Sequence, residues 1–217
     1  MDTYKITYII IFIIICLYIN DDNYQNDFYQ NIVIITDPTI DVLVNKNNQL
    51  QKDYIPNNLV LIDLEYGYNN KYMVKEAYEQ FVLLHNDASI LGLEIIIVSA
   101  YRSYEYQENL YNGYVESKGL DYADKCSARA GHSEHQTGLA IDVSNFKTDY
   151  DDFFYTDEYL WMKDNSYKYG FILRYNIGTE YITGFKFEPW HYRYVGTKLA
   201  TYLYENNLTL EEYKKKD

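Results

Sequence analysis

The sequence is poor in cysteine, proline, glycine and positive charge. Its 217 residues include 2 Cys, 3 Pro and 10 Gly, too few for a disulfide framework, a collagen-like chain or a low-complexity chain. Lys and Arg total 19 against 32 Asp and Glu, which leaves a formal net charge of −13. A chain this acidic is repelled by phosphate backbones, so nucleic acid is not an expected partner. Neither cysteine has a CxxC neighbour, and we interpret Cys126 as a packing residue.

The chain does contain enough apolar sequence to build one core. Hydrophobic residues make up 47% of it and charged residues 24%, which is typical of a globular protein and excludes wholesale disorder. The length fits one ordinary domain better than two large ones. The 28 tyrosines are spread along the sequence, and we interpret them as compositional bias, not as a site.

The amino terminus has the pattern of an export signal. A short, weakly positive start precedes an apolar run from Ile6 to Ile19. At about 1.5 Å per residue this run spans about 21 Å as a helix, short of the ~30 Å hydrocarbon core. Bulky residues stand where a cleavage site needs small ones, and those before Cys16 do not fit a lipoprotein signal. We expect residues 1–20 to be a signal peptide or, in preference, an uncleaved signal anchor.

This export pattern sets the expected domain organisation and location. Residues 21–31 are polar and aperiodic, as in a tether, and residues 32–213 hold the strand and helix patterns of the folded domain. A buried first strand or helix is the alternative interpretation of the apolar run. We expect the domain to lie outside the cytoplasm, attached to the membrane through the N-terminal segment, as a monomer.

Hydrophobic spacing alternates along the domain between strand-like and helix-like patterns. Short β-branched or alternating runs predict strands over residues 32–35, 42–44, 94–98, 139–143, 171–175 and 190–195. Apolar residues at three-and-four spacing, or polar caps and glycine stops, predict helices over residues 72–90, 103–117, 157–169 and 197–206. This mixture predicts one α+β domain. We expect a single compact domain, mainly an antiparallel sheet with flanking helices, and the histidine segments described next add a zinc site on the sheet face.

The zinc expectation comes from two segments, residues 131–142 and 187–194, which together hold three of the four histidines. The alternating pattern of the strand before residue 143 places Asp142 on the face opposite its apolar neighbours. Gly138 allows the chain to turn just before that strand, which can bring His135 over the same face. A carboxylate and an imidazole that converge in this way need one more nitrogen to complete a three-ligand zinc site, and His191 can supply it.

The two remaining histidines are not expected to bind the metal. His132 is the alternative ligand, but two residues from His135 it would compete for the same space. We therefore expect His132 either to contact the metal ligands without binding the metal itself, or to face solvent. His85 falls within the predicted helix over residues 72–90, where a structural role is the simpler interpretation.

Together, the two histidine segments resemble a known enzyme family. The residues that carry the likeness are Ser133, His135, Gly138, Ala140 and Asp142, followed by Glu188-Pro189-Trp190-His191. They are similar to the paired motifs of the VanY-like zinc D,D-carboxypeptidases of peptidase family M15. The upstream Ser99-Ala100-Tyr101-Arg102-Ser103, with Gln107, matches that family's substrate-binding segment. The likeness spans residues 99–196, and the one departure we note is Ala130, where family members often carry proline.

The resemblance implies one zinc ion per chain, held by His135, Asp142 and His191, with Glu188 as general base. Glu188 and His191 are three residues apart, so in an uninterrupted strand they would face opposite sides of the sheet. Pro189 prevents a simple continuation of the strand. A turn at residues 188–190 can therefore bring both side chains to one cavity.

The resemblance also implies which residues meet the substrate. Arg102, Gln107 and Ser133 correspond to contacts with the peptide, and Arg102 is a catalytic candidate as well, because it would neutralise either the terminal carboxylate or the developing oxyanion. The implied substrate is the stem peptide of peptidoglycan, from which a D,D-carboxypeptidase removes the C-terminal D-residue. With the export pattern, this substrate implies a location on the outer face of the bacterial cytoplasmic membrane or in the cell wall.

Other functions remain open at this point. An L,D-carboxypeptidase on the same scaffold is the nearest alternative. A D-Ala-D-Ala dipeptidase fits less well, because the two motifs resemble the carboxypeptidase branch. A non-catalytic zinc or peptidoglycan-binding module is the alternative from another class, and the presence of Glu188 argues against it.

Overall fold

The structure is a computed structural model that describes residues 31–215. Its centre is a four-stranded antiparallel sheet with the strand order β5-β6-β8-β7. The strands are β5 (Ile96–Ser99), β6 (Ala140–Ser144), β7 (Phe171–Leu173) and β8 (His191–Tyr194). Two smaller sheets flank it: β1 (Val33–Ile35) runs parallel to β2 (Asn48–Leu50), and β3 (Leu59–Leu61) runs antiparallel to β4 (Tyr72–Val74). The α+β class with a mainly antiparallel sheet is confirmed.

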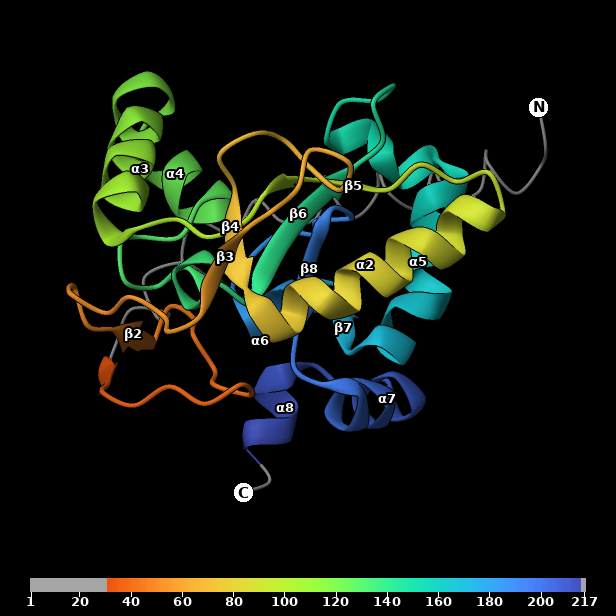
Figure 1. Cartoon of the computed structure of the whole chain (residues 1–217). Coiled ribbons are helices and arrows are strands. Elements are labelled where there is room, and N and C mark those ends of the chain that lie inside the picture. Colours follow the sequence, from red (N-terminus) through yellow and green to blue (C-terminus); the bar gives the residue numbers. More distant parts are fainter. Residues whose placement is uncertain (1–30, 216–217) are drawn as a thin grey trace.

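Helices surround the central sheet. They are α2 (Lys75–Ile90), α3 (Tyr104–Lys118), α4 (Leu120–Cys126), α5 (Asp157–Asn165), α6 (Glu180–Thr183), α7 (Thr197–Asn206) and α8 (Leu210–Lys214), with short 3₁₀ turns η1 (Glu134–Thr137), η2 (Asp151–Tyr155) and η3 (Ser166–Tyr169). Figure 1 shows α2 lying across the central sheet, α3 and α4 together beyond one side of it, and α7 and α8 at the C-terminal end of the chain.

One face of the central sheet is covered by α2. Ile141 of β6 and Tyr192 of β8 belong to the same buried cluster as Phe81 of α2, and all three have almost no exposed surface. Since side chains alternate along a strand, Asp142 and His191 point to the opposite face. The alternation predicted around Asp142 is therefore confirmed, and the face away from α2 carries the polar residues.

The strand register lines up three of these polar residues. Ser99 of β5 pairs with Asp142 of β6, and Asp142 pairs with His191 of β8. The ladder is irregular between Ile97 and Ser99, and such irregularities re-aim side chains at the edge of a sheet. Three residues that are far apart in the sequence thus form a row across the sheet.

The strand predicted over residues 42–44 is absent. Val42 and Val44 are buried with Leu50 in a small separate cluster, which explains the apolar run. The carbonyl oxygen of Val42 accepts a hydrogen bond from Arg193 at 2.9 Å, and that of Ile40 accepts one at 3.0 Å. A side chain thus takes the place of a neighbouring strand, and the ladder forms only later, at β2.

Two predicted helices have different limits. The helix predicted from residue 72 begins at Lys75, because Tyr72–Val74 pair with β3 as a strand. The helix predicted over residues 157–169 ends at Asn165 and continues as the 3₁₀ turn η3 before Gly170. The helices α3 and α7 and the remaining predicted strands lie within about two residues of their expected limits, the usual uncertainty of such boundaries.

The expected signal segment, residues 1–20, lies outside the described residues, as does the expected tether, residues 21–31, apart from Asn31. Cys16 falls there too. Between residues 31 and 215, none of the helices combines the length and the apolar character that a bilayer-spanning segment needs. The membrane anchor therefore stays a prediction.

Gly138 connects the segment of His135 to β6 through a left-handed turn. Its φ is +68°, and an added Cβ would lie 2.9 Å from Cδ2 of Leu59. We expect Gly138→Ala to lower the free energy of unfolding by about 1–3 kcal/mol, because both the backbone and the neighbour resist the new methyl group. The control is Gly113→Ala in α3, where nothing lies within 4 Å of the added Cβ and a gain of about 0.5–1 kcal/mol is expected. Urea denaturation measures both, and equal changes would contradict the prediction.

Candidate metal centre and active-site cleft

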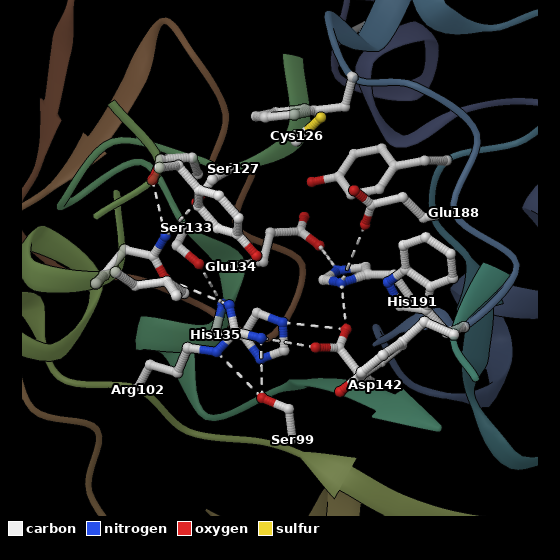
Figure 2. A pocket seen from close by; sticks show the side chains of 18 of the residues that line it. Ser99, Arg102, Cys126, Ser127, Ser133, Glu134, His135, Asp142, Glu188 and His191 are labelled. Carbon is white, nitrogen blue, oxygen red and sulfur yellow. Dashed lines mark hydrogen bonds and ion pairs between the residues drawn. The ribbon is translucent and has the colours of Figure 1, made fainter. Parts of the chain in front are cut away.

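A cleft of about 420 Å³ opens over the polar face of the central sheet. Asp142 and His191 reach it from the sheet, and His135 reaches it from η1. Arg102 and Glu188 stand on opposite sides of this group (Figure 2). The structure therefore brings together the residues that the two motifs and the upstream segment predicted.

Three potential ligand atoms converge in this cleft. Nε2 of His135 lies 3.3 Å, and Nδ1 of His191 lies 3.0 Å, from Oδ1 of Asp142. One ligand atom from each of the three residues lies within 4.8 Å of the others. Ligand atoms around a tetrahedral zinc ion are about 3.3–3.6 Å apart, given metal–ligand distances of ~2.0–2.2 Å. The donor set and its spacing therefore fit zinc with three protein ligands and a fourth position open.

The ring of His135 is oriented by the backbone. Its Nδ1 lies 2.7 Å from the carbonyl oxygen of Ala100, which can only accept a hydrogen bond, so Nδ1 carries the proton and Nε2 is available to a metal. Burial, together with the positive charge of Arg102, lowers the pKa of His135 to about 4. Both effects favour the neutral form that metal binding requires.

His191 is held between two carboxylates. Its Nδ1 faces Asp142 at 3.0 Å, and its Nε2 lies 3.4 Å from Oε2 of Glu134. Burial opposes its charged form, but the hydrogen bonds to Asp142 and Glu134 outweigh burial and raise the pKa of His191 to about 9. The carboxylates thus favour a positive charge at this point of the cleft, which is the charge that a metal cation brings.

Arg102 supports Asp142 from the other side. Nη2 of Arg102 donates to Oδ2 of Asp142 at 2.7 Å and to Oγ of Ser99 at 2.9 Å. Its Nη1 makes a longer contact of 3.4 Å with Oε1 of Gln107. The guanidinium therefore fixes the carboxylate oxygen that does not face the histidines, and it places a positive charge at the edge of the cleft.

Glu188 lies beside the three ligand atoms. Its Oε2 is 3.9 Å from Nδ1 of His191, and burial raises the pKa of Glu188 to about 7. The chain turns at Pro189, and the amide of His191 donates to the carbonyl oxygen of Glu188 at 3.3 Å. The predicted turn is confirmed, and it delivers both side chains to the same cleft.

Gln107 and Ser133 line the cleft, and their polar groups are also used within its wall. Nε2 of Gln107 donates to Oγ of Ser127 at 3.1 Å and to the carbonyl oxygen of Ala128 at 2.8 Å. Oγ of Ser133 accepts from the amide of His135 at 3.3 Å. These bonds brace the wall, and a contact between either residue and substrate stays a prediction.

The two other histidines lie outside the ligand triad. His132 is buried, not solvent-exposed, and its Nδ1 lies 2.9 Å from the carbonyl oxygen of Asn45. His85 lies 2.7 Å from the carbonyl oxygen of Ile95 through its Nδ1, in agreement with a structural role. Cys126 is half-buried and lines the cleft.

Sequence reasoning missed Glu134. This carboxylate is buried, and its Oε1 accepts hydrogen bonds from Nε of Arg174 at 2.8 Å and Nη1 of Arg193 at 2.9 Å. Burial opposes ionisation, but the two arginines hold the pKa of Glu134 well below its usual range. A glutamate between two motif residues gave a weak signal, because most glutamates in a sequence are solvent-exposed.

The VanY family model, described as D-alanyl-D-alanine carboxypeptidase, matches residues 70–197. The chain belongs to this family. The matched segment contains the candidate ligand triad (His135, Asp142 and His191), Glu188 and Arg102, so the resemblance drawn from the motifs is confirmed. VanY proteins form a family of carboxypeptidases, which are hydrolases.

Two relatives of known structure share the fold of this chain and differ in the specificity that their names state, and a third relative, YodJ, is similar in sequence. The LdcB LD-carboxypeptidase is 40% identical with a TM-score of 0.80, covering 90% of this chain and 96% of its own. The vancomycin resistance D,D-pentapeptidase VanY, solved in complex with Zn(II), is 33% identical with a TM-score of 0.69, covering 80% and 97%. YodJ of Bacillus subtilis strain 168 is 42% identical over 181 residues, which are 80% of this chain and 66% of YodJ. The chain thus spans about two thirds of that relative.

Proposed function

We propose that this VanY-family chain is a zinc-dependent D,D-carboxypeptidase that removes the C-terminal D-residue from peptidoglycan stem peptides outside the cell. The observation that carries the proposal is the Glu188 carboxylate, 3.9 Å from His191 and beside the three ligand atoms. A carboxylate inside the ligand set would close the open position, whereas one beside it can move a proton. The Zn(II) complex of the related VanY protein supports the choice of metal.

The residues of the cleft divide the chemistry between them. His135, Asp142 and His191 would hold the zinc ion, which would supply a Lewis acid for the scissile carbonyl and for the attacking water. Glu188 accepts the proton of the attacking water and delivers it to the leaving amine. A carboxyl group whose pKa burial has raised toward neutrality suits both transfers. Arg102 places positive charge where the substrate carboxylate or the oxyanion lies.

We expect Arg102 to make the enzyme require a free carboxylate at the end of its substrate. Nε and Nη2 of Arg102 already donate to Ser99 and Asp142, whereas Nη1 makes only a long contact with Gln107, so Nη1 is the nitrogen that can donate a charged hydrogen bond to that group. Amidation of the terminal carboxylate should therefore cost the wild type far more activity than it costs Arg102→Ala. Zinc content is measured in both proteins, because Arg102 also holds Asp142. Equal losses at equal zinc content would show that Arg102 does not recognise the carboxylate.

An L,D-carboxypeptidase is the second candidate, because the LdcB LD-carboxypeptidase aligns over 90% of this chain with a TM-score of 0.80. The two activities differ in the stereocentre on the acyl side of the scissile bond, while the metal, the base and the leaving D-residue are common to both. The residues of the ligand triad and Glu188 therefore serve either reaction.

Purified muropeptides distinguish these possibilities. We expect the domain to release D-alanine from a pentapeptide stem and to leave a tetrapeptide stem intact, with release stopped by a chelator. Release from the tetrapeptide alone would indicate the L,D activity. Binding of either stem without cleavage, in a protein that holds zinc, would indicate a non-catalytic module. Mass spectrometry of the products identifies the bond that is cut.

The proposed substrate implies a location outside the cytoplasm. Peptidoglycan stem peptides are cleaved in the cell wall, and the related LdcB LD-carboxypeptidase recognises peptidoglycan. Attachment to the membrane through residues 1–20, followed by a tether, would place the cleft within reach of this substrate. Fractionation of cells that produce the full chain, probed for the domain, tests the anchor.

A further inference from the structure

A chain of buried charged groups leads from the metal triad to the C-terminal helix. Oε2 of Glu134 faces Nε2 of His191 at 3.4 Å, while its Oε1 accepts bonds from Arg174 at 2.8 Å and Arg193 at 2.9 Å. Arg174 also donates to both carboxylate oxygens of Glu211 in α8, at 2.8 and 2.7 Å. The side chains of Glu134 and both arginines have no exposed surface.

The nitrogen atoms of His191 have separate partners. A neutral imidazole carries one proton, so one nitrogen donates and the other has a free lone pair. An ionised carboxylate can only accept. If Nε2 donates to Glu134, the lone pair stays on Nδ1, which is the atom that faces Asp142 and the ligand triad.

We propose that Glu134 is the positioning residue of the metal centre: it accepts the Nε2 proton of His191 and so fixes the ring and the tautomer that present Nδ1 to the metal. The inference rests on the proposed function in that it takes the triad as a zinc site. Carboxylates in this position make the ligand more basic and orient it, and their loss costs about 10–100-fold in metal affinity.

The two arginines explain how a carboxylate can serve this purpose in the interior. A lone buried carboxylate becomes protonated, and it would then compete with His191 as a donor. Arg174 and Arg193 both bind Oε1 and hold the group ionised, which leaves Oε2 to His191. Glu211 in turn balances Arg174. The fixed partners on Oε1 therefore set the direction of Oε2.

Neighbouring residues in η1 thus act on two different ligands. His135 is a ligand itself, with its Nδ1 proton on the carbonyl oxygen of Ala100, and Glu134 orients His191. The proposal therefore requires the two ligand rings to be opposite tautomers: His135 protonated at Nδ1 and His191 protonated at Nε2.

NMR of the zinc-loaded wild type tests this requirement without any substitution. The chain has 4 histidines. In two-bond ¹H–¹⁵N spectra of ¹⁵N-histidine protein, His85→Ala and His132→Ala identify two of the rings and leave the triad intact, and through-space contacts with Tyr175, which packs against His191, distinguish His191 from His135. We expect the Nδ1-H tautomer for His135 and the Nε2-H tautomer for His191. An Nδ1-H tautomer for His191 would overturn the proposal, whether or not the protein cleaves peptides.

Zinc affinity of Glu134→Gln gives the second readout. We expect the Kd for zinc, from competition with a chromophoric chelator, to rise about 10–100-fold. The matched control is Asp124→Asn, which breaks a different partly buried pair, in which Arg129 donates to the carboxylate at 3.0 and 2.7 Å. This variant should lose stability but keep the zinc Kd within a few-fold of wild type.

The outcomes separate the inference from the proposed function. Equal zinc affinities in Glu134→Gln and the wild type would overturn the positioning role. Equal losses of affinity in Glu134→Gln and Asp124→Asn would show a merely structural effect and overturn it as well. If Glu134→Gln does not fold, the wild-type tautomers decide. A protein that binds zinc with the expected tautomers but cleaves no stem peptide would refute the proposed function alone.

Discussion

Replacing Glu188 by glutamine is expected to remove nearly all hydrolysis while zinc stays bound. The side chain lies beside the triad, 3.9 Å from Nδ1 of His191, but it is not one of the three residues whose ligand atoms converge, so we expect it to move protons and not to hold the metal. Glutamine has almost the same size but cannot accept a proton. We expect kcat to fall by at least ~10²-fold, the lower range for loss of a general base, with zinc content and the circular dichroism spectrum unchanged.

A second buried glutamate provides the control for Glu188→Gln. Glu158 accepts hydrogen bonds from the side chain of Asn145 and the amide of Glu94, in a different part of the domain. Glu158→Gln should keep both zinc and activity. Activity of Glu188→Gln within a few-fold of wild type, at full zinc content, would rule out its role as base. Loss of zinc along with activity would instead make Glu188 a ligand.

Replacing His135 by alanine is expected to remove both zinc and activity. It deletes one of three ligands, and Nε2 of His135 is 3.3 Å from the ligand oxygen of Asp142. The wild type should contain one zinc ion per chain, whereas His135→Ala should contain far less than one. The variant should also gain no thermal stability from added zinc, because metal binding contributes to folding only where a site exists.

His132→Ala is the matched control for His135→Ala. His132 is a buried histidine of the same segment, but its ring contacts the backbone of Asn45 and lies outside the triad. It should keep full zinc content, even if the fold becomes less stable. Full zinc occupancy in His135→Ala, measured by atomic emission after dialysis, would contradict the ligand assignment.

The convergence of His135, Asp142 and His191 could be predicted because its sequence signals are local. Asp142 is a charged residue between two apolar residues of a predicted strand, Ile141 and Val143. In the structure it is buried in β6. Gly138 signals the turn that brings His135 back, and it has the left-handed φ of +68°. Pro189 signals the second turn. Each of these signals depends on residues within a few positions of the ligand.

The contacts of Glu134 could not be predicted in the same way. Its partners Arg174 and Arg193 are 40 and 59 residues away, and their approach depends on how β7 and β8 pair. Arg193 also explains why residues 42–44 do not form the predicted strand. The apolar pattern there was correct about burial, but Arg193 occupies the carbonyl oxygen of Val42, and hydrophobic spacing does not show which partner a backbone group will find.

The most direct test of a zinc-dependent carboxypeptidase is a zinc titration of the metal-free protein, with D-alanine release from a pentapeptide stem measured at each addition. Three protein ligands with one open position predict no release without zinc, a linear rise as zinc is added, and a break at one zinc ion per chain. Release that is unaffected by removal of the metal, or a zinc-loaded protein that releases no residue from any stem peptide, would contradict this function.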